Sequence, residues 1–313
     1  MLMLGEIQTG LLQNSASVPL LLCVEALGLV PGERVRHSER PIGYAVSPDL
    51  LTGVDCQLPT NSGAKVRGIG TVISRAMITE GRVLQGSAFT RIRQGRAGRR
   101  LSWSYYLSKP GEVETTGRFN PEDIAVGFLT REQEISVLDL GAISGRTMDE
   151  VQKSRDLDRR PPFRGARTRL RWVAMQGKGA AGDIQFCVES QTLRTVRIDV
   201  PDSAVWDVVE LCEDLALHDW LLTTLKIFIE RSRMGEGSRS QVVDKLQPAI
   251  DHLLHLWMPA ARLGEWGASI WERLERQPGF SRQWNTMVHR IRDQMLISAI
   301  ALLSDALDGI RRS

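Results

Sequence analysis

The chain has 313 residues, of which 42% are hydrophobic and 25% charged, a composition typical of globular proteins. This excludes a largely disordered chain, a collagen-like repeat and a small disulfide-stapled protein. The 40 Lys and Arg residues nearly balance the 37 Asp and Glu residues, so the net charge of +3 requires neither a nucleic acid nor an anionic membrane as partner.

A short helix is expected close to the N-terminus. Ser17 is a candidate cap, Pro19 suits the first turn, and Gly28 marks the end. This helix interrupts a region that otherwise consists of β-branched runs separated by Gly, Pro and Asn, which is typical of strands and turns.

Two β-hairpins are predicted in the first 200 residues. Residues 65–79 and 82–93 flank a tight turn in which Gly81 can adopt a positive φ. Residues 183–190 and 193–200 form the second pair of strands, and the following proline ends the ladder.

After residue 200 the apolar residues recur at helical spacing. Asp202 and Ser203 are candidate caps of a helix whose apolar positions reach residue 229, either continuously or as two helices. Further helices are predicted at residues 241–258, with a kink or a fresh start at Pro248, and at residues 266–277. The last helix is expected to begin at Ser281, and its long apolar stripe must pack against the preceding helices or against a partner.

These elements predict an α+β fold in two parts. A β-rich domain with hairpins and one early helix is expected over residues 1–200, and an α-helical bundle domain over residues 201–313.

The four cysteines show no paired spacing, so we expect buried, reduced thiols rather than a disulfide framework. No Lys or Arg precedes Arg34, which argues against a secretory signal. The apolar stretches 19–30 and 295–303 are too short to span a bilayer. The expected location is therefore the cytoplasm, without membrane insertion.

Motif analysis predicts no catalytic residue, no cofactor and no metal. Residues 177–182 match G-x-G-x-x-G, but a strand rather than a helix follows them, so a hairpin loop is the better interpretation. Ser144 lies in only a loose imitation of a nucleophile elbow, and no base can be assigned to it. His252 and His255 are three residues apart, and His289 and Asp293 are four apart, but such spacings recur by chance, so we interpret these histidines as ordinary surface or partly buried residues.

The strongest local signal is basic. Residues 81–111 contain no Asp or Glu, and aromatic residues follow the arginines closely, a combination that suits phosphates and bases. A solvated loop with intramolecular ion pairs explains the same pattern. The candidate residues for binding an anion or a nucleic acid are Arg91, Arg93, Arg96, Arg99, Arg100 and Trp103.

Six of the eight tryptophans lie in the helical part of the chain. Tryptophan is common both in protein cores and at interface hot spots, and a small bundle has limited room for so many indoles. The candidate residues for docking a partner are Trp257, Trp266, Trp271 and Trp284.

Three segments, residues 1–14, 31–44 and 51–55, resemble an actinobacterial protein family of unknown function. The resemblance covers most of the chain. Members of that family are encoded beside a variant P-loop protein and a methyltransferase-like protein. The resemblance therefore implies a component of a multi-protein system, with a P-loop-type partner and without catalytic residues that can be carried over.

The leading hypothesis is a non-catalytic interaction or adaptor protein that docks a protein partner, or a second copy of itself, through tryptophan-rich helical faces. The alternative is a protein that binds nucleic acid or a nucleotide phosphate through residues 91–100. An enzyme whose site is assembled from distant residues is the third hypothesis, because composition and fold do not fix function.

Overall fold

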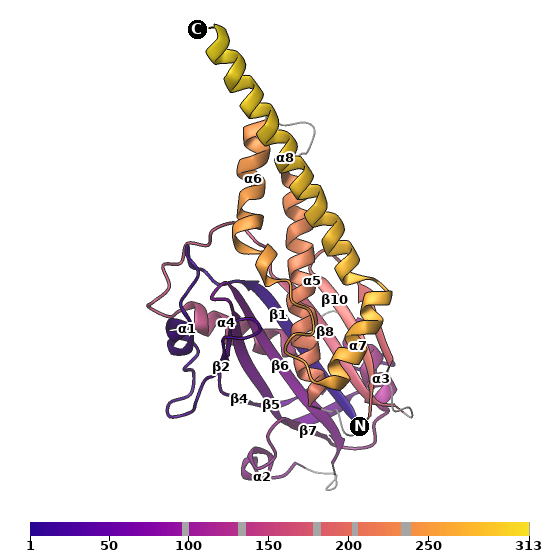
Figure 1. Ribbon diagram of the computed structural model, residues 1–313. Coiled ribbons are helices and arrows are strands. Elements are labelled where there is room, and N and C mark those ends of the chain that lie inside the picture. The colour runs from indigo at the N-terminus through magenta and orange to yellow at the C-terminus, as the bar shows by residue number, and fades with distance from the viewer. Residues whose placement is uncertain (96–99, 131–135, 178–182, 202–205, 233–238, 313) are drawn as a thin grey trace.

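The computed structural model describes residues 1–95, 100–130, 136–177, 183–201, 206–232 and 239–312 (Figure 1). A mixed ten-stranded sheet runs through the centre of the described part of the chain, in the order β2-β3-β5-β7-β6-β1-β8-β10-β9, with β4 also paired to β5. The strands are β1 (Leu2–Leu11), β2 (Arg36–Ser38), β3 (Tyr44–Val46), β4 (Leu50–Leu58), β5 (Val66–Thr79), β6 (Val83–Gln94), β7 (Glu112–Thr115), β8 (Thr168–Gln176), β9 (Asp183–Val188) and β10 (Leu193–Val200).

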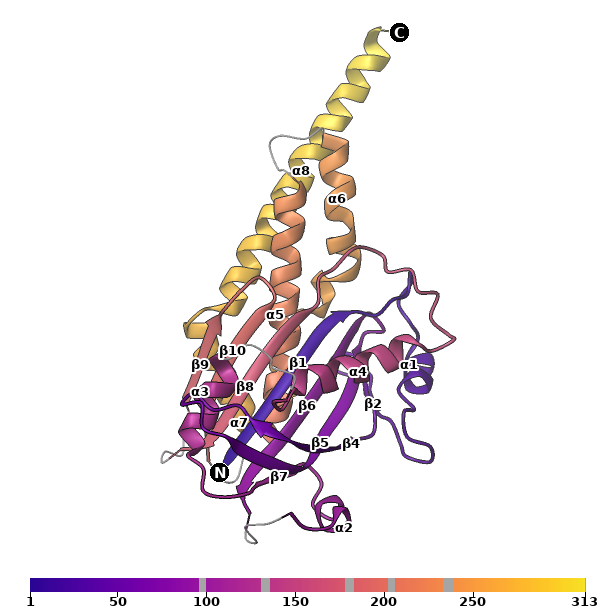
Figure 2. The same cartoon turned by 180° about the vertical axis from the view of Figure 1, so that it is seen from behind.

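Helices cover both faces of this sheet (Figures 1 and 2). One face carries α4, which packs on β1, β5 and β6, together with α3 and α1, and the other carries the C-terminal helices led by α5. The described helices are α1 (Leu20–Ala26), α2 (Trp103–Leu107), α3 (Pro121–Thr130), α4 (Leu140–Gln152), α5 (Asp207–Ser232), α6 (Arg239–His252), the 3-10 turn η2 (Leu254–Leu256), α7 (Glu265–Arg276) and α8 (Phe280–Arg312). The predicted α+β class is confirmed.

The central strand β1 is buried on both sides. Met3 and Ile7 belong to the hydrophobic cluster shared with α5, whereas Leu2 and Leu4 belong to the cluster under α3 and α4. Neighbouring strand residues point to opposite faces, so both faces of β1 are covered, and its buried Glu6 is paired with Arg171 of β8 at 3.0 Å. Gly5 lets the Trp172 ring of β8 cross the strand closely, since a Cβ there would lie 2.1 Å from the indole.

Both predicted hairpins are confirmed. β5 pairs antiparallel with β6, and β9 pairs antiparallel with β10. At the first turn both Glu80 (φ 49°) and Gly81 (φ 58°) are left-handed, and a Cβ at Gly81 would collide with the Val18 carbonyl oxygen at 2.0 Å. Glycine is therefore required at that position.

The early and last helices are where they were predicted, but their starts differ. α1 begins after Pro19, and Ser17 does not cap it; the Ser17 hydroxyl donates instead to the Glu80 carbonyl oxygen. α8 begins at Phe280, and Ser281 bonds through its amide and hydroxyl to the Glu275 carboxylate, so the Ser281 cap is wrong. The proposed caps Asp202 and Ser203 lie outside the described residues.

α5 is one continuous helix of 26 residues, which resolves the alternative left open by the sequence. Its apolar side chains join those of β1, β8 and β10 in a single cluster that also includes α6, α7 and α8. Arg75 of β5 and Glu213 of α5 add a buried ion pair of 2.7 Å between the two layers. The sheet and the C-terminal helices thus share one core, and a division into two folding units at residue 200 stays a prediction.

Burial of the cysteines is mixed. Cys23 and Cys212 are buried and free, as expected, but Cys187 is free and exposed on β9. Burial raises the pKa of the Cys23 thiol to about 11, which keeps it protonated and unreactive at neutral pH.

Candidate functional site

A cleft of about 1060 Å³ opens at the C-terminal end of β6, beside β7. Near their turn β5 and β6 pair directly, whereas farther along β7 lies between them, pairing with Gly68–Gly70 of β5 and with Arg91–Gln94 of β6. The wedge formed by β7 brings its own acidic residues next to the arginines of β6. The lining residues are Met1, Leu2, Arg91, Ile92, Arg93, Gln94, Tyr105, Lys109, Glu112, Glu114, Phe119, Pro121 and Trp206.

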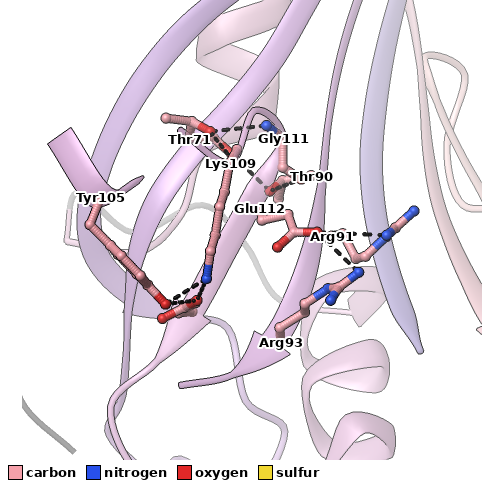
Figure 3. Close-up of polar contacts among 9 residues, drawn as sticks. Thr71, Thr90, Arg91, Arg93, Tyr105, Lys109, Gly111 and Glu112 are labelled. Atoms are coloured by element: carbon pink, nitrogen blue, oxygen red, sulfur yellow. Dashed lines mark hydrogen bonds and ion pairs between the residues drawn. The ribbon is translucent and has the colours of Figure 1, made fainter. Parts of the chain in front are cut away.

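Two arginines share one carboxylate in this cleft (Figure 3). Arg91 and Arg93 approach the same oxygen of Glu112, Oε1, at 3.6 and 3.0 Å. The group therefore carries one positive charge in excess. Arg93 is half exposed, with 51% of its side chain accessible, whereas Arg91 is 16% accessible.

Arg91 also lies over an indole. Its guanidinium carbon is 5.2 Å from the ring centroid of Trp206, a cation–π distance. Trp206 nevertheless remains 55% exposed. Burial, followed by the neighbouring charge of Arg93, lowers the pKa of Arg91 below its ordinary value. The Nε atom of Arg91 is buried without a hydrogen-bond partner in the described residues.

A second ion pair forms the other wall of the cleft. Lys109 Nζ contacts Glu114 Oε1 at 2.7 Å, and the Tyr105 hydroxyl donates to the same oxygen at 2.9 Å. Hydrogen bonding to Glu114 raises the pKa of Lys109. In contrast to Arg91 and Arg93, this set is neutral and closed on itself.

Backbone contacts fix the turn that precedes β7 (Figure 3). The Thr71 hydroxyl accepts from the Gly111 amide at 2.9 Å and donates to the Lys109 carbonyl oxygen at 3.1 Å. Thr90 donates to the carbonyl oxygens of Thr71 and Gly111. Gly111 has a φ of 71°, which favours glycine. The cleft is thus built on strands rather than on a loose loop.

The six predicted anion-binding residues do not form one site. Arg91 and Arg93 line the cleft, whereas Arg96 and Arg99 lie outside the described residues. Arg100 and Trp103 form a separate pair beside β4: the Arg100 guanidinium is 5.6 Å from the Trp103 ring and 3.5 Å from Asp55. Neither residue of that pair lines the cleft.

Sequence reasoning missed half of the cleft. The acid-free stretch ends at Gly111, so Glu112 and Glu114, which pair with the cations of the cleft, lie just beyond the basic segment. Trp206 is more than a hundred positions from Arg91 in the sequence, and only the tertiary fold brings the two together. No local pattern could have revealed that pairing.

The four predicted docking tryptophans pack against their own chain. Trp271 and Trp284 are buried, with 3% and 4% of their surfaces exposed, and Trp257 stacks on Trp284 at 4.4 Å between centroids. Trp266 is partly buried against the same core. The prediction that these indoles form the docking face is therefore wrong for Trp271 and Trp284, because the bundle accommodates them beside the sheet.

An exposed apolar surface occurs elsewhere, on the far half of α8. This helix runs past the other C-terminal helices toward the C-terminus (Figures 1 and 2). Four large aliphatic side chains on it are 59–65% exposed: Leu296, Ile297, Ile300 and Leu303. We call these four residues the distal stripe. Ser298, between them, is buried, so only one side of α8 is covered at this level.

The residues weighed for chemistry lie apart. Ser144 is buried within α4, and its hydroxyl donates to the Gly141 carbonyl oxygen of the same helix. His252 stacks on Phe163, while His255 and His289 are exposed. Among the described residues no three His, Cys, Asp or Glu side chains gather as a metal site would require.

Comparison with protein-family models, with curated proteins and with solved structures finds no match to this chain. The family resemblance and the P-loop-type partner stay predictions. Of the helices that the structure describes, none combines the length and the apolar character needed to cross a bilayer.

Proposed function

We propose that the protein is a non-catalytic interaction protein that docks a second copy of itself through the distal stripe of α8. The observation that carries this proposal is the exposure of Leu296, Ile297, Ile300 and Leu303 on one helix. Large aliphatic side chains exposed together, rather than singly, mark interaction surfaces.

The spacing of the distal stripe supports packing against another helix. Leu296, Ile300 and Leu303 are separated by four and three residues, so they lie on one side of α8, with Ile297 at its edge. Fully burying an aliphatic side chain contributes about 1.5–3 kcal/mol. The four side chains of each copy are 59–65% exposed, so covering all eight contributes about 7–14 kcal/mol, which is comparable with an association cost of about 4–15 kcal/mol.

The distal stripe favours a second copy in antiparallel orientation because it can cover itself. With a two-fold axis between Ala299 and Ile300, Leu296 of each copy lies opposite Leu303 of the other. The same residues then meet from both copies, as an isologous interface requires.

The proposal is tested by sedimentation velocity on the full chain from about 1 to 100 µM, the range expected for a modest interface. The wild type is expected to move from the 34.9 kDa monomer to a dimer. The double variant Ile297→Asp with Ile300→Asp is expected to stay monomeric, because four new carboxylates would be buried in the pair.

The matched control is Asn285→Asp with Thr286→Asp, which adds the same charge to exposed positions nearer the start of α8. It is expected to dimerise like the wild type. A wild-type chain that remains monomeric throughout, or a control that loses dimerisation equally, would contradict the proposal. The cytoplasmic location and membership of a multi-protein system belong to this proposal as well.

A further inference from the structure

The cleft beside β7 has chemistry that self-association through α8 does not use. It combines two arginines on one carboxylate oxygen, an exposed indole and a second carboxylate already held by a lysine and a tyrosine. The two arginines come from β6, their shared carboxylate Glu112 comes from β7, and the indole belongs to Trp206, the residue that precedes α5. All of these side chains line the same cleft of about 1060 Å³.

We infer that this cleft binds a nucleoside monophosphate, with the phosphate between Arg91 and Arg93, the base on Trp206 and the ribose hydroxyls on Glu112. This ligand matches the three kinds of groups that line the cleft. It is a site independent of the distal stripe of α8.

The arginines suit a phosphate because guanidinium groups donate in a planar fork that fits its oxygens. Arg91 and Arg93 both contact Oε1 of Glu112, so two positive charges face one negative charge. The neighbouring cation Arg93 and burial both disfavour the charge on Arg91. A bound phosphate would supply the missing negative charge.

Trp206 suits a base because more than half of it is exposed although Arg91 already lies over the ring. An aromatic side chain stacks on any base, and this contributes about 1–3 kcal/mol in single-strand binding proteins. The edge-on contact with Phe89, at 6.4 Å between centroids, holds the indole in place.

Glu112 suits the sugar. Arg91 and Arg93 contact its Oε1 at 3.6 and 3.0 Å. A carboxylate oxygen accepts hydrogen bonds from ribose hydroxyls in dinucleotide-binding folds. The Glu112 carboxylate can therefore accept a ribose hydroxyl once the arginines have moved onto the phosphate.

A free nucleotide fits better than a nucleic acid strand. Glu112 and Glu114 both line the cleft, and a strand carrying a phosphate at every residue would pass close to these carboxylates. A monophosphate needs only the one cationic end. The volume of the cleft also lies near the upper end of the range for small-molecule sites.

The test is isothermal titration calorimetry of the full chain with AMP, adenosine, inorganic phosphate, 2′,3′-dideoxy-AMP and a (dA)10 oligonucleotide. AMP is expected to bind at one site per chain, at least about tenfold more tightly than adenosine or phosphate, each of which takes only part of the cleft. Arg93→Ala and Trp206→Ala are expected to weaken AMP binding about tenfold or more.

The matched controls are Arg100→Ala and Trp103→Ala, which remove the same side chains from the pair beside β4 and should change AMP affinity less than about twofold. Glu112→Gln tests the sugar contact. The wild type should prefer AMP to 2′,3′-dideoxy-AMP, and this preference should disappear in Glu112→Gln even if overall affinity rises. Circular dichroism checks that each variant is folded.

The inference is overturned if AMP does not bind at millimolar concentration, or if Arg93→Ala and Trp206→Ala bind it as the wild type does. Tighter binding of (dA)10 than of AMP would overturn the choice of a free nucleotide. The monomeric variant Ile297→Asp with Ile300→Asp should retain AMP binding. Loss of dimerisation and loss of nucleotide binding are therefore distinguishable results.

Discussion

The two halves of α8 have the same kind of apolar pattern, but the apolar side chains of the first half are buried and those of the second half are exposed. In the first half Trp284, Val288 and Ile291 are buried against the core shared with α5, α7 and the sheet. In the second half the side chains of the distal stripe are largely exposed, although they are as hydrophobic as those of the first half. The sheet and the shorter helices cover the beginning of α8, and the helix then continues beyond them (Figure 1).

The difference shows that an amphipathic pattern predicts that a helix face will be covered, but not by what. Within the first half the covering groups come from the same chain. Within the second half the described residues provide cover on only one side, at Ser298. The first half of α8 therefore belongs to the core of the fold, and we propose that the second half serves association.

The largest expected effect is in the covered half. Trp284→Ala should lower the free energy of unfolding by about 3–5 kcal/mol, because it removes a buried indole and its stack on Trp257. Urea unfolding at low micromolar concentration measures this. A loss below about 1 kcal/mol would mean that the first half is not part of the core.

Breaking the ion pair between Arg75 of the sheet and Glu213 of α5 is expected to lower the free energy of unfolding by a similar or slightly smaller amount. Burial by itself would lower the pKa of Arg75, yet the ion pair with Glu213 raises it above the ordinary value. Removing one member of a buried pair leaves the other unpaired, which costs about 3–5 kcal/mol. Glu213→Ala should therefore destabilise the chain strongly, whereas Glu150→Ala, which breaks an exposed pair with Lys153, should cost less than about 1 kcal/mol.

Acid should weaken the covered half through His218. This side chain is packed between Trp257 and Trp271, and burial lowers its pKa despite the Asp214 carboxylate at 3.5 Å. Glu275 also favours the charged form, whereas Arg262 opposes it. The Nδ1 atom contacts the Asp214 carbonyl oxygen at 2.7 Å, while the buried Nε2 has no partner among the residues that the structure describes, so a second proton would find no acceptor there.

The sign of the pH effect follows from that shift. Below the ordinary histidine pKa of about 6.5 the unfolded chain binds a proton that the folded chain does not, so stability falls as the pH is lowered from about 7.5 toward the depressed folded pKa. Urea unfolding at several pH values should show a shallower slope for His218→Gln than for the wild type. Equal slopes would contradict a neutral, buried His218.

The smallest effect is expected in the exposed half. Leu303→Ala should change the unfolding free energy of the monomer by less than about 0.5 kcal/mol, because the side chain is 65% exposed. The same substitution should weaken dimerisation. A loss comparable to that of Trp284→Ala would show that the chain itself covers the distal stripe.

The sequence predicted both hairpins and the extent of the helical region, since each rests on local periodicity and on turn residues such as Gly81. It did not predict β1, because a strand buried on both faces lacks alternation. It also could not show that Trp271 is buried against His218 and that Trp284 is buried under Trp257. The cleft was only half predicted: Arg91 and Arg93 lie in a recognisable basic segment, whereas Trp206 reaches them through the fold alone.

The central claim is that a second copy covers the distal stripe, and amide hydrogen exchange followed against protein concentration tests it most directly. The account predicts that residues 294–303 become more protected between about 0.1 and 100 µM, while residues 284–291 are protected equally throughout. Exchange at residues 294–303 that does not depend on concentration would contradict it.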